Sequence, residues 1–313
     1  MIQNNQIVPR RSLPPAGRQT RQVDSFEQVV DAFLEAKLVA NRARNTIVYY
    51  QNILGQFQRM HPNWPPTYEK VVNFLIAKKE TCSKYTIYKL HKGLTAFLNW
   101  CDKFGYLPQN PVDLLDSPRR PHKLPKPATP ETIKALFTIL DQHAEFGEVM
   151  AIRDRALFRL AYDTGARATE LATLELENLD LDWGKVLISC AKNDRERSVF
   201  FGQKCQTSLQ DWLVFHPGGA WLFPNRFRTE LQPLTRRGVL NSVKKWSALA
   251  DVKLTVHQIR HTYATHALRQ GIDIGLIQHQ MGHTRLETTA IYLGVDDEMR
   301  RQAHQSGVLG DKL

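Results

Sequence analysis

Apolar residues recur at helical spacing from position 24 onward, and this spacing places them on one face of a helix. The first stripe is Phe26, Val29, Val30, Phe33 and Leu34. Three more are Ile47, Tyr50, Leu54 and Phe57; Val71, Val72, Leu75 and Ile76; and Ile87, Leu90, Leu94, Phe97, Leu98 and Cys101. The pattern predicts a compact bundle of four or five helices over residues 24–116, with these stripes as its core.

A proline-rich segment follows the predicted bundle. Five of the fourteen residues 117–130 are prolines. Proline lacks a backbone N–H and fixes φ, so it disfavours both helix and sheet. Residues 117–130 are therefore expected to form an extended linker, and a second domain is expected over residues 131–313.

The second half of the chain mixes helical stripes with two short apolar runs. Thr129 and Pro130 have the order of a helix cap followed by a proline in the first turn. The predicted helical positions are Ile133, Leu136, Phe137 and Leu140, then Ala156, Leu157, Leu160 and Ala161, with a stop at Gly165.

Residues 183–190 and 198–201 read as two strands, joined by a polar hairpin tip that carries Lys192. Helical patterns return after Thr255, with breaks at Gly271 and Gly282, and a capping box at 284–287 is expected to open a last short helix. The expected fold is mainly α with a small antiparallel β-sheet, an α+β chain.

The charge of the chain favours a polyanionic partner. It has 42 Lys and Arg against 31 Asp and Glu, a formal net charge of +11, which attracts nucleic acid first. Residues 1–23 read as a flexible basic arm without the apolar core of a secretory signal, and no apolar run is long enough to cross a membrane. Four cysteines without zinc-type spacing indicate a reducing cytoplasm.

Two arginines in separate motifs are candidates for holding a phosphodiester. Arg167 lies in the run Thr-Gly-Ala-Arg-Ala-Thr-Glu-Leu over 164–171, and Arg260 lies in His-Gln-Ile-Arg-His-Thr-Tyr-Ala-Thr-His over 257–266. Cleaving a phosphodiester requires fixed cations on its non-bridging oxygens. The planar fork of arginine gives two parallel hydrogen bonds and keeps its charge.

Four further side chains supply the remaining chemistry. His257 shares a predicted helical face with Arg260 and is suited to accept a proton. His283 is a candidate donor to a phosphoryl oxygen, and Lys192 could protonate the departing 5′ oxygen if its pKa falls. Tyr292 is the candidate nucleophile, because a covalent phosphotyrosine conserves the energy of the broken bond.

These runs, with Met281-Gly-His283 and Thr288-Thr-Ala-Ile-Tyr292, resemble the signature motifs of the tyrosine recombinases, the phage-integrase and Xer-type family. The resemblance is close over about 125–296. It is one of character only over 24–116, which resembles the family's helical core-binding domain. It implies a two-domain, C-shaped clamp on double-stranded DNA, with 131–313 as the catalytic domain.

The resemblance also implies a mechanism. Tyr292 would form a 3′-phosphotyrosyl link and release a 5′ hydroxyl, and four protomers on paired sites would exchange strands through a Holliday junction. The catalytic set would be Arg167, Lys192, His257, Arg260, His283 and Tyr292, with no cofactor or metal. Integration, excision or resolution of DNA elements would be the task, with accessory DNA-bending or directionality proteins as further partners.

Basic residues outside this set are candidates for contacts with the DNA backbone. They are Arg42, Arg44, Lys84, Lys89, Arg119, Arg120, Lys123 and Lys126.

Three other functions fit parts of the sequence. A zinc hydrolase is suggested by His257 and His261 at helical spacing, but Gln258 stands where that motif needs a glutamate. A protein that grips DNA without cutting it would share the charge. A type IB topoisomerase would share the phosphotyrosine chemistry without pairing two sites.

Overall fold

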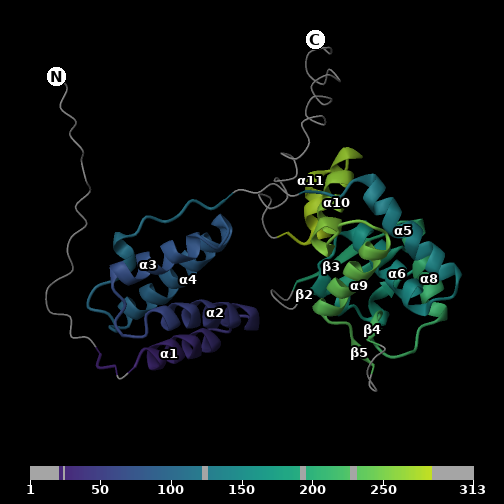
Figure 1. Ribbon diagram of the computed structural model, residues 1–313. Helices are drawn as coiled ribbons and strands as arrows, with labels where there is room; N and C mark the ends of the chain where they lie inside the picture. The colour runs from purple at the N-terminus through teal and green to yellow at the C-terminus, as the bar shows by residue number, and fades with distance from the viewer. Residues whose placement is uncertain (1–20, 24, 122–125, 191–194, 226–230, 284–313) are drawn as a thin grey trace, which may run out of the picture. The chain divides into compact units, whose positions relative to one another are not determined.

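The computed structural model describes residues 21–283 except 24, 122–125, 191–194 and 226–230. The chain divides into two compact units, residues 1–122 and 123–313, which are drawn in Figure 1. The division falls inside the proline-rich segment at 117–130. Within that segment, the described residues before Pro130 form no helix or strand.

The N-terminal unit is a bundle of helices. Its elements are α1 (Phe26–Val39), α2 (Arg44–Met60), α3 (Tyr68–Lys79), α4 (Lys84–Lys103) and a 3-10 helix, η1 (Pro111–Leu114). Ser25, Thr67 and Ser83 cap α1, α3 and α4 with side-chain oxygens, which satisfies N–H groups that a helix start leaves unpaired. Phenylalanines from all four helices fill the core: Phe33, Phe57, Phe74 and Phe97.

One predicted core stripe is wrong in part. In α3 the buried residues are Val71 and Phe74, whereas Ile76 is 57% exposed. Val71 and Phe74 are three positions apart and share a helical face. Ile76 is two positions after Phe74 and so lies about 200° around the helix from it. The larger Phe74 ring fills the core, so Ile76 turns to solvent.

The C-terminal unit is mainly helical. Its helices are α5 (Pro130–Glu145), α6 (Val149–Thr164), α7 (Ala168–Ala172), η2 (Leu176–Asn178), α8 (Gln203–Val214), α9 (Arg236–Leu249), α10 (Val256–Arg269) and α11 (Ile274–Met281). Its strands are β1 (Leu179–Asp180), β2 (Lys185–Cys190), β3 (Arg195–Phe200), β4 (Pro224–Asn225) and β5 (Gln232–Pro233). All strand pairs are antiparallel. Helix α6 packs against α5, α8 and α10.

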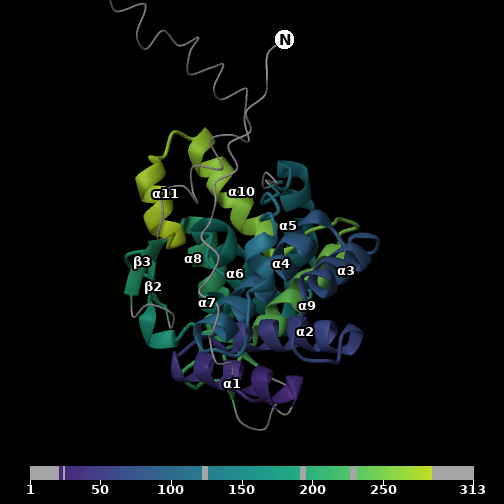
Figure 2. The same ribbon diagram turned by 90° about the vertical axis from the view of Figure 1, so that its left-hand side faces the viewer.

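The predicted fold class, mainly α with a small antiparallel sheet, is confirmed. Thr129 caps α5 and Pro130 stands in its first turn, as predicted. Helices α10 and α11 are separate, with a break at Gly271, and they lie side by side in both views (Figures 1 and 2). Among the helices of the described residues, none is long and apolar enough to cross a membrane.

The second predicted strand begins earlier than expected. The sequence pattern predicts the polar tip over 192–196 and the strand from Ser198, but β3 starts at Arg195, and its pairing with β2 sets Ile188 opposite Arg197. The polar side chains are held on the strand by specific partners. The Ser189 hydroxyl donates to Glu196 (3.2 Å), and Arg197 forms a buried ion pair.

A buried charged group ties α6 to α9. The Arg153 guanidinium donates to Asp154 through Nε (2.9 Å) and Nη2 (2.7 Å), and the Trp246 indole N–H donates to the same carboxylate (2.8 Å). All three side chains are buried. A buried carboxylate is tolerated only when its oxygens are paired in this way.

Replacing Asp154 by alanine should therefore destabilise the C-terminal unit by about 3–5 kcal/mol, because a buried guanidinium and an indole N–H lose their acceptor. Urea denaturation measures the change. The exposed Glu177 is the control, and Glu177→Ala should change stability by less than about 0.5 kcal/mol. Equal effects of the two substitutions would contradict this account of the core.

Candidate active site

Three arginines from different elements meet at the end of α11. Helix α11 ends at Met281, and Gly282 follows with φ +65°. The last carbonyls of a helix lack partners within the helix. Three of them accept from guanidinium groups: Gln280 from Arg197 Nε (3.0 Å), Met281 from Arg260 Nη2 (2.8 Å) and Gly282 from Arg167 Nη2 (3.0 Å). Arg167, Arg197 and Arg260 form the arginine cluster.

Arg260 joins the ends of two helices. It lies on α10 and is only 4% exposed. Besides Met281, its guanidinium donates through Nη1 to the carbonyl of Gly165, the residue that ends α6. Gly165 has φ +60°, and a Cβ there would lie 2.6 Å from the Tyr263 ring. Glycine is thus required at the position that presents this carbonyl.

Arg167 lies two residues after Gly165 and is the N-cap of α7. Its Nη1 donates to Glu170 Oε1 (2.8 Å), and its backbone N–H donates to Glu170 Oε2 (2.8 Å). Its side chain keeps 40% of its surface exposed. A fixed, partly exposed guanidinium of this kind can receive an anion from solvent.

Glu170 lies between two arginines. Both of its oxygens also accept from Arg197, at 3.1 Å from Nη1 and 2.8 Å from Nη2. Burial by itself would raise the pKa of the Glu170 carboxyl, but the hydrogen bonds and charge of Arg197, and then those of Arg167, hold that pKa below its ordinary value. Glu170 is therefore an anion that bridges two cations.

Three histidines adjoin the cluster. Burial and the nearby arginines, Arg260 first, lower the pKa of His283 to about 3. Burial, His257 and Arg260 lower the pKa of His261 to about 4. The pKa of His257 is also lowered, by loss of water around the ring and by the charges of Arg260 and Arg167. The rings of His257 and His261 meet edge to face, with centroids 4.2 Å apart.

Four of the six predicted catalytic residues are described. Arg167, Arg260 and His283 meet at the end of α11, and His257 stands on α10 one turn before Arg260. Lys192 and Tyr292 lie outside the described residues. The roles of all six stay predictions.

The sequence patterns do not identify two charged residues of the site, Glu170 and Arg197. Glu170 lies in the same motif as Arg167, and its place three residues after Arg167 is a capping-box signal. Arg197 lies between the predicted polar tip and the predicted strand, and the sequence pattern assigns it no role. Only its strand register opposite the apolar Ile188 indicates that its side chain points inward.

The predicted DNA contacts are exposed wherever they are described. Arg42 precedes α2, Arg44 is its first residue, and Lys84 and Lys89 lie on α4. Tyr49 of α2 donates to the Lys89 carbonyl (2.6 Å), which fixes these two helices together. The remaining exposed residues are Arg119, Arg120 and Lys126. Lys123 lies outside the described residues.

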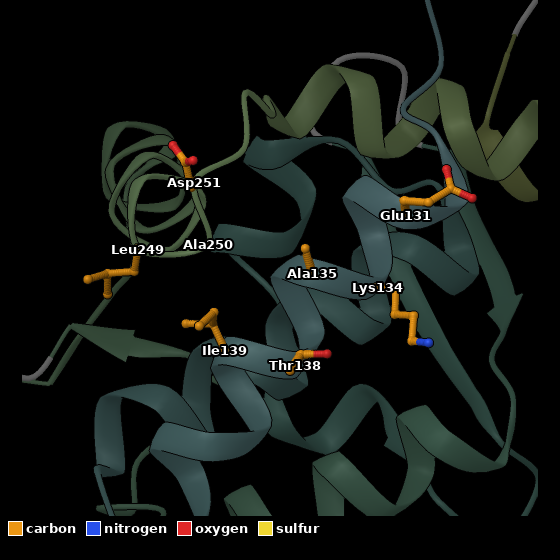
Figure 3. Close-up of a pocket in the computed structure, with 8 residues that line it drawn as sticks. All are labelled: Glu131, Lys134, Ala135, Thr138, Ile139, Leu249, Ala250 and Asp251. Atoms are coloured by element: carbon orange, nitrogen blue, oxygen red, sulfur yellow. The ribbon is translucent and has the colours of Figure 1, made fainter.

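Other features of the C-terminal unit fit a ligand site less well. An open apolar groove of about 440 Å³ lies between α5 and the end of α9 (Figure 3). Its lining includes Ala135, Ile139 and Leu249 but none of the predicted catalytic residues. Over the described ranges, no three His, Cys, Asp or Glu side chains gather in a group that could hold a metal ion.

Comparison with known proteins identifies the family of the chain. The model of the phage integrase family matches residues 128–299, more than half of the chain. The tyrosine recombinase XerA of Pyrococcus furiosus is 29% identical over 287 residues, which are 91% of this chain and 96% of XerA.

Two solved structures share the fold. One is the XerH site-specific recombinase bound to a palindromic difH substrate, a post-cleavage complex (TM-score 0.71, 21% identity, 89% of this chain and 83% of XerH). The other is a lambda integrase tetramer bound to a Holliday junction (TM-score 0.69, 14% identity, 84% of this chain and 78% of the integrase). The chain belongs to the phage integrase family of tyrosine recombinases.

Proposed function

We propose that the chain cleaves and rejoins DNA strands at a specific site, with the phosphodiester held by Arg167 and Arg260. The observation that carries the proposal is the arginine cluster itself. Arg167 and Arg260 lie 115 and 21 positions from the residues whose carbonyls accept from them. These two carbonyls are adjacent, so the fold brings two guanidinium groups together. Fixed cations on one phosphodiester are what the reaction needs most.

In the proposed reaction the Tyr292 phenol oxygen attacks the phosphorus atom, and its proton passes to His257. The bond from phosphorus to the 5′ oxygen breaks, and Lys192 gives that oxygen a proton. The products are a 3′-phosphotyrosyl link and a 5′ hydroxyl. Attack by a 5′ hydroxyl on the phosphotyrosine reverses these steps, so rejoining needs no external energy source.

The histidine environment supports these roles. Rings with lowered pKa values are neutral at pH 7, so His257 can accept a proton and His283 can donate a hydrogen bond to a phosphoryl oxygen. A bound phosphodiester adds a negative charge that offsets the arginines. It should raise the pKa of His257 and so make that ring a stronger base.

The wider assembly is proposed by analogy. Exposed basic residues on α2 and α4 would contact the DNA backbone, with the N-terminal unit as a core-binding domain and the C-terminal unit as the catalytic domain. Four protomers on paired sites would exchange strands through a Holliday junction, as the lambda integrase tetramer suggests. Accessory proteins would set the direction of exchange.

Removing the nucleophile tests the central step. Tyr292→Phe should bind its DNA site with unchanged affinity but form no covalent adduct, because the phenyl ring has no oxygen to attack phosphorus. A nicked suicide substrate followed by denaturing electrophoresis reveals the adduct. Tyr88→Phe, on α4, is the matched control and should form it normally. An adduct that persists in Tyr292→Phe would refute the assignment.

The proposed acid can be tested through the leaving atom. Lys192→Ala should slow cleavage of a normal strand by about 10²–10⁴-fold, the usual contribution of a general acid. A substrate with sulfur in place of the 5′ oxygen needs no proton and should restore the rate. Cleavage rates of the two substrates are compared in single-turnover assays. Equal losses on both would remove Lys192 from this role.

The protonation states can be measured directly. In the DNA-free protein the His283 ring should titrate at about pH 3 and His261 at about pH 4, against about 6.5 in an unfolded chain. Because these pKa values are lower in the folded chain, the unfolded chain binds more protons between about pH 6.5 and pH 3. The free energy of unfolding therefore falls as the pH drops through this range. Ring resonances followed by NMR, assigned with His283→Gln, give the values.

Adding a DNA site should raise the His283 pKa, because the phosphodiester offsets the arginine charges. A His283 ring that titrates near 6.5 without DNA would contradict the described surroundings. A ring unaffected by bound DNA would argue against its contact with the phosphate.

A further inference from the structure

We propose that Arg197 is a positioning residue, which holds the Arg167 guanidinium and the backbone before His283 in one fixed arrangement. This inference rests on the proposed function, since it assigns Arg167 to the phosphodiester. Arg197 itself is buried, with 9% of its surface exposed. Its Nε donates to the Gln280 carbonyl, and its Nη1 and Nη2 donate to Glu170. It therefore acts through these neighbours and not on the substrate.

The first connection runs through Glu170. Each Glu170 oxygen accepts one hydrogen bond from Arg197 and one from Arg167. A bidentate arginine–carboxylate pair fixes both the distance and the plane of the two groups. The orientation of Glu170, and through it that of Arg167, is thus set by Arg197.

The second connection runs through the end of α11. Arg197 Nε donates to the Gln280 carbonyl (3.0 Å), and the Gln280 side chain donates back to the Phe200 carbonyl of β3 (2.6 Å). Strand β3 and α11 lie beside each other in Figure 2. Gly282, whose carbonyl accepts from Arg167, packs so closely on Arg197 that a Cβ there would lie 2.7 Å from its Cζ.

Charge gives Arg197 a second effect on Arg167. Glu170 is an anion next to Arg167, and alone it would neutralise the cation that the phosphodiester needs. The arginine cluster and Glu170 together carry a formal net charge of +2. Without Arg197 this charge falls to +1, and the Glu170 carboxylate pairs with Arg167 alone. Arg197 thus leaves Arg167 available to a ligand.

Buried arginines also stabilise a fold, so stability needs a control in the experiment. Arg153 is buried and paired with a carboxylate in the same unit, but it contacts Asp154, the Pro224 carbonyl and no member of the cluster. Arg153→Met and Arg197→Met remove the same group from a similar setting. Adduct formation on a suicide substrate is measured per folded molecule, below the melting temperature of both variants.

Arg197→Met should bind the DNA site and cleave about 100-fold or more slowly, the loss typical of a misplaced catalytic group. Arg153→Met should cleave at the wild-type rate. Arg197→Lys should remain at least about 10-fold slow, because an ammonium cannot reproduce the planar fork. If Arg197→Met fails to fold, Arg197→Lys takes its place throughout.

A double-mutant cycle with Arg167→Ala identifies the route. Arg167→Ala should slow cleavage, and the double variant should lose less than the product of the two single losses, because part of the effect of Arg197 passes through Arg167. Multiplied losses, or wild-type cleavage by Arg197→Met, would overturn the inference and leave the proposed function intact. No adduct from the wild-type chain, or normal cleavage by Arg167→Ala, would instead overturn the proposed function.

Discussion

The end of α11 is the constraint on which the site depends. A helix C-terminus carries unpaired carbonyls and a partial negative charge, and cations nearby are favourable. Here three consecutive carbonyls accept from three arginines, which lie at the N-cap of α7, on β3 and on α10. Hydrogen bonds with charged donors are short and directional. One helix end therefore fixes groups that are far apart in sequence.

The carbonyl acceptors allow the Arg260 guanidinium to stay charged although it is buried. A buried guanidinium is costly unless its N–H groups find acceptors. Arg260 finds them in the carbonyls of Gly165 and Met281, which are neutral. Its charge is thus solvated by backbone dipoles without being cancelled. Glu170 is the one acceptor here that carries a charge, and its carboxylate pairs with both Arg167 and Arg197.

Much of this could be predicted from the sequence, because helical spacing and motif order are local signals. The stripes of α1, α5 and α6, the cap at Thr129 and the break at Gly271 needed only near neighbours. Arg167, Arg260 and His283 were identified by their motifs. The errors concern tertiary choices. Whether Phe74 or Ile76 fills the core depends on which face of α3 meets α4, and propensity does not decide that. Arg197 carries no local signal of its role, because its acceptors lie 27 and 83 positions away.

Two separate requirements restrict the residue at position 282. Its left-handed backbone ends α11, which asparagine can also do at some cost. Its missing side chain leaves room for the Arg197 guanidinium, which no other residue type provides. Local geometry and long-range contact thus restrict the same position independently. In a library of random substitutions, tolerance at position 282 should stay narrow even after stabilising changes elsewhere, because added global stability does not create space beside Arg197.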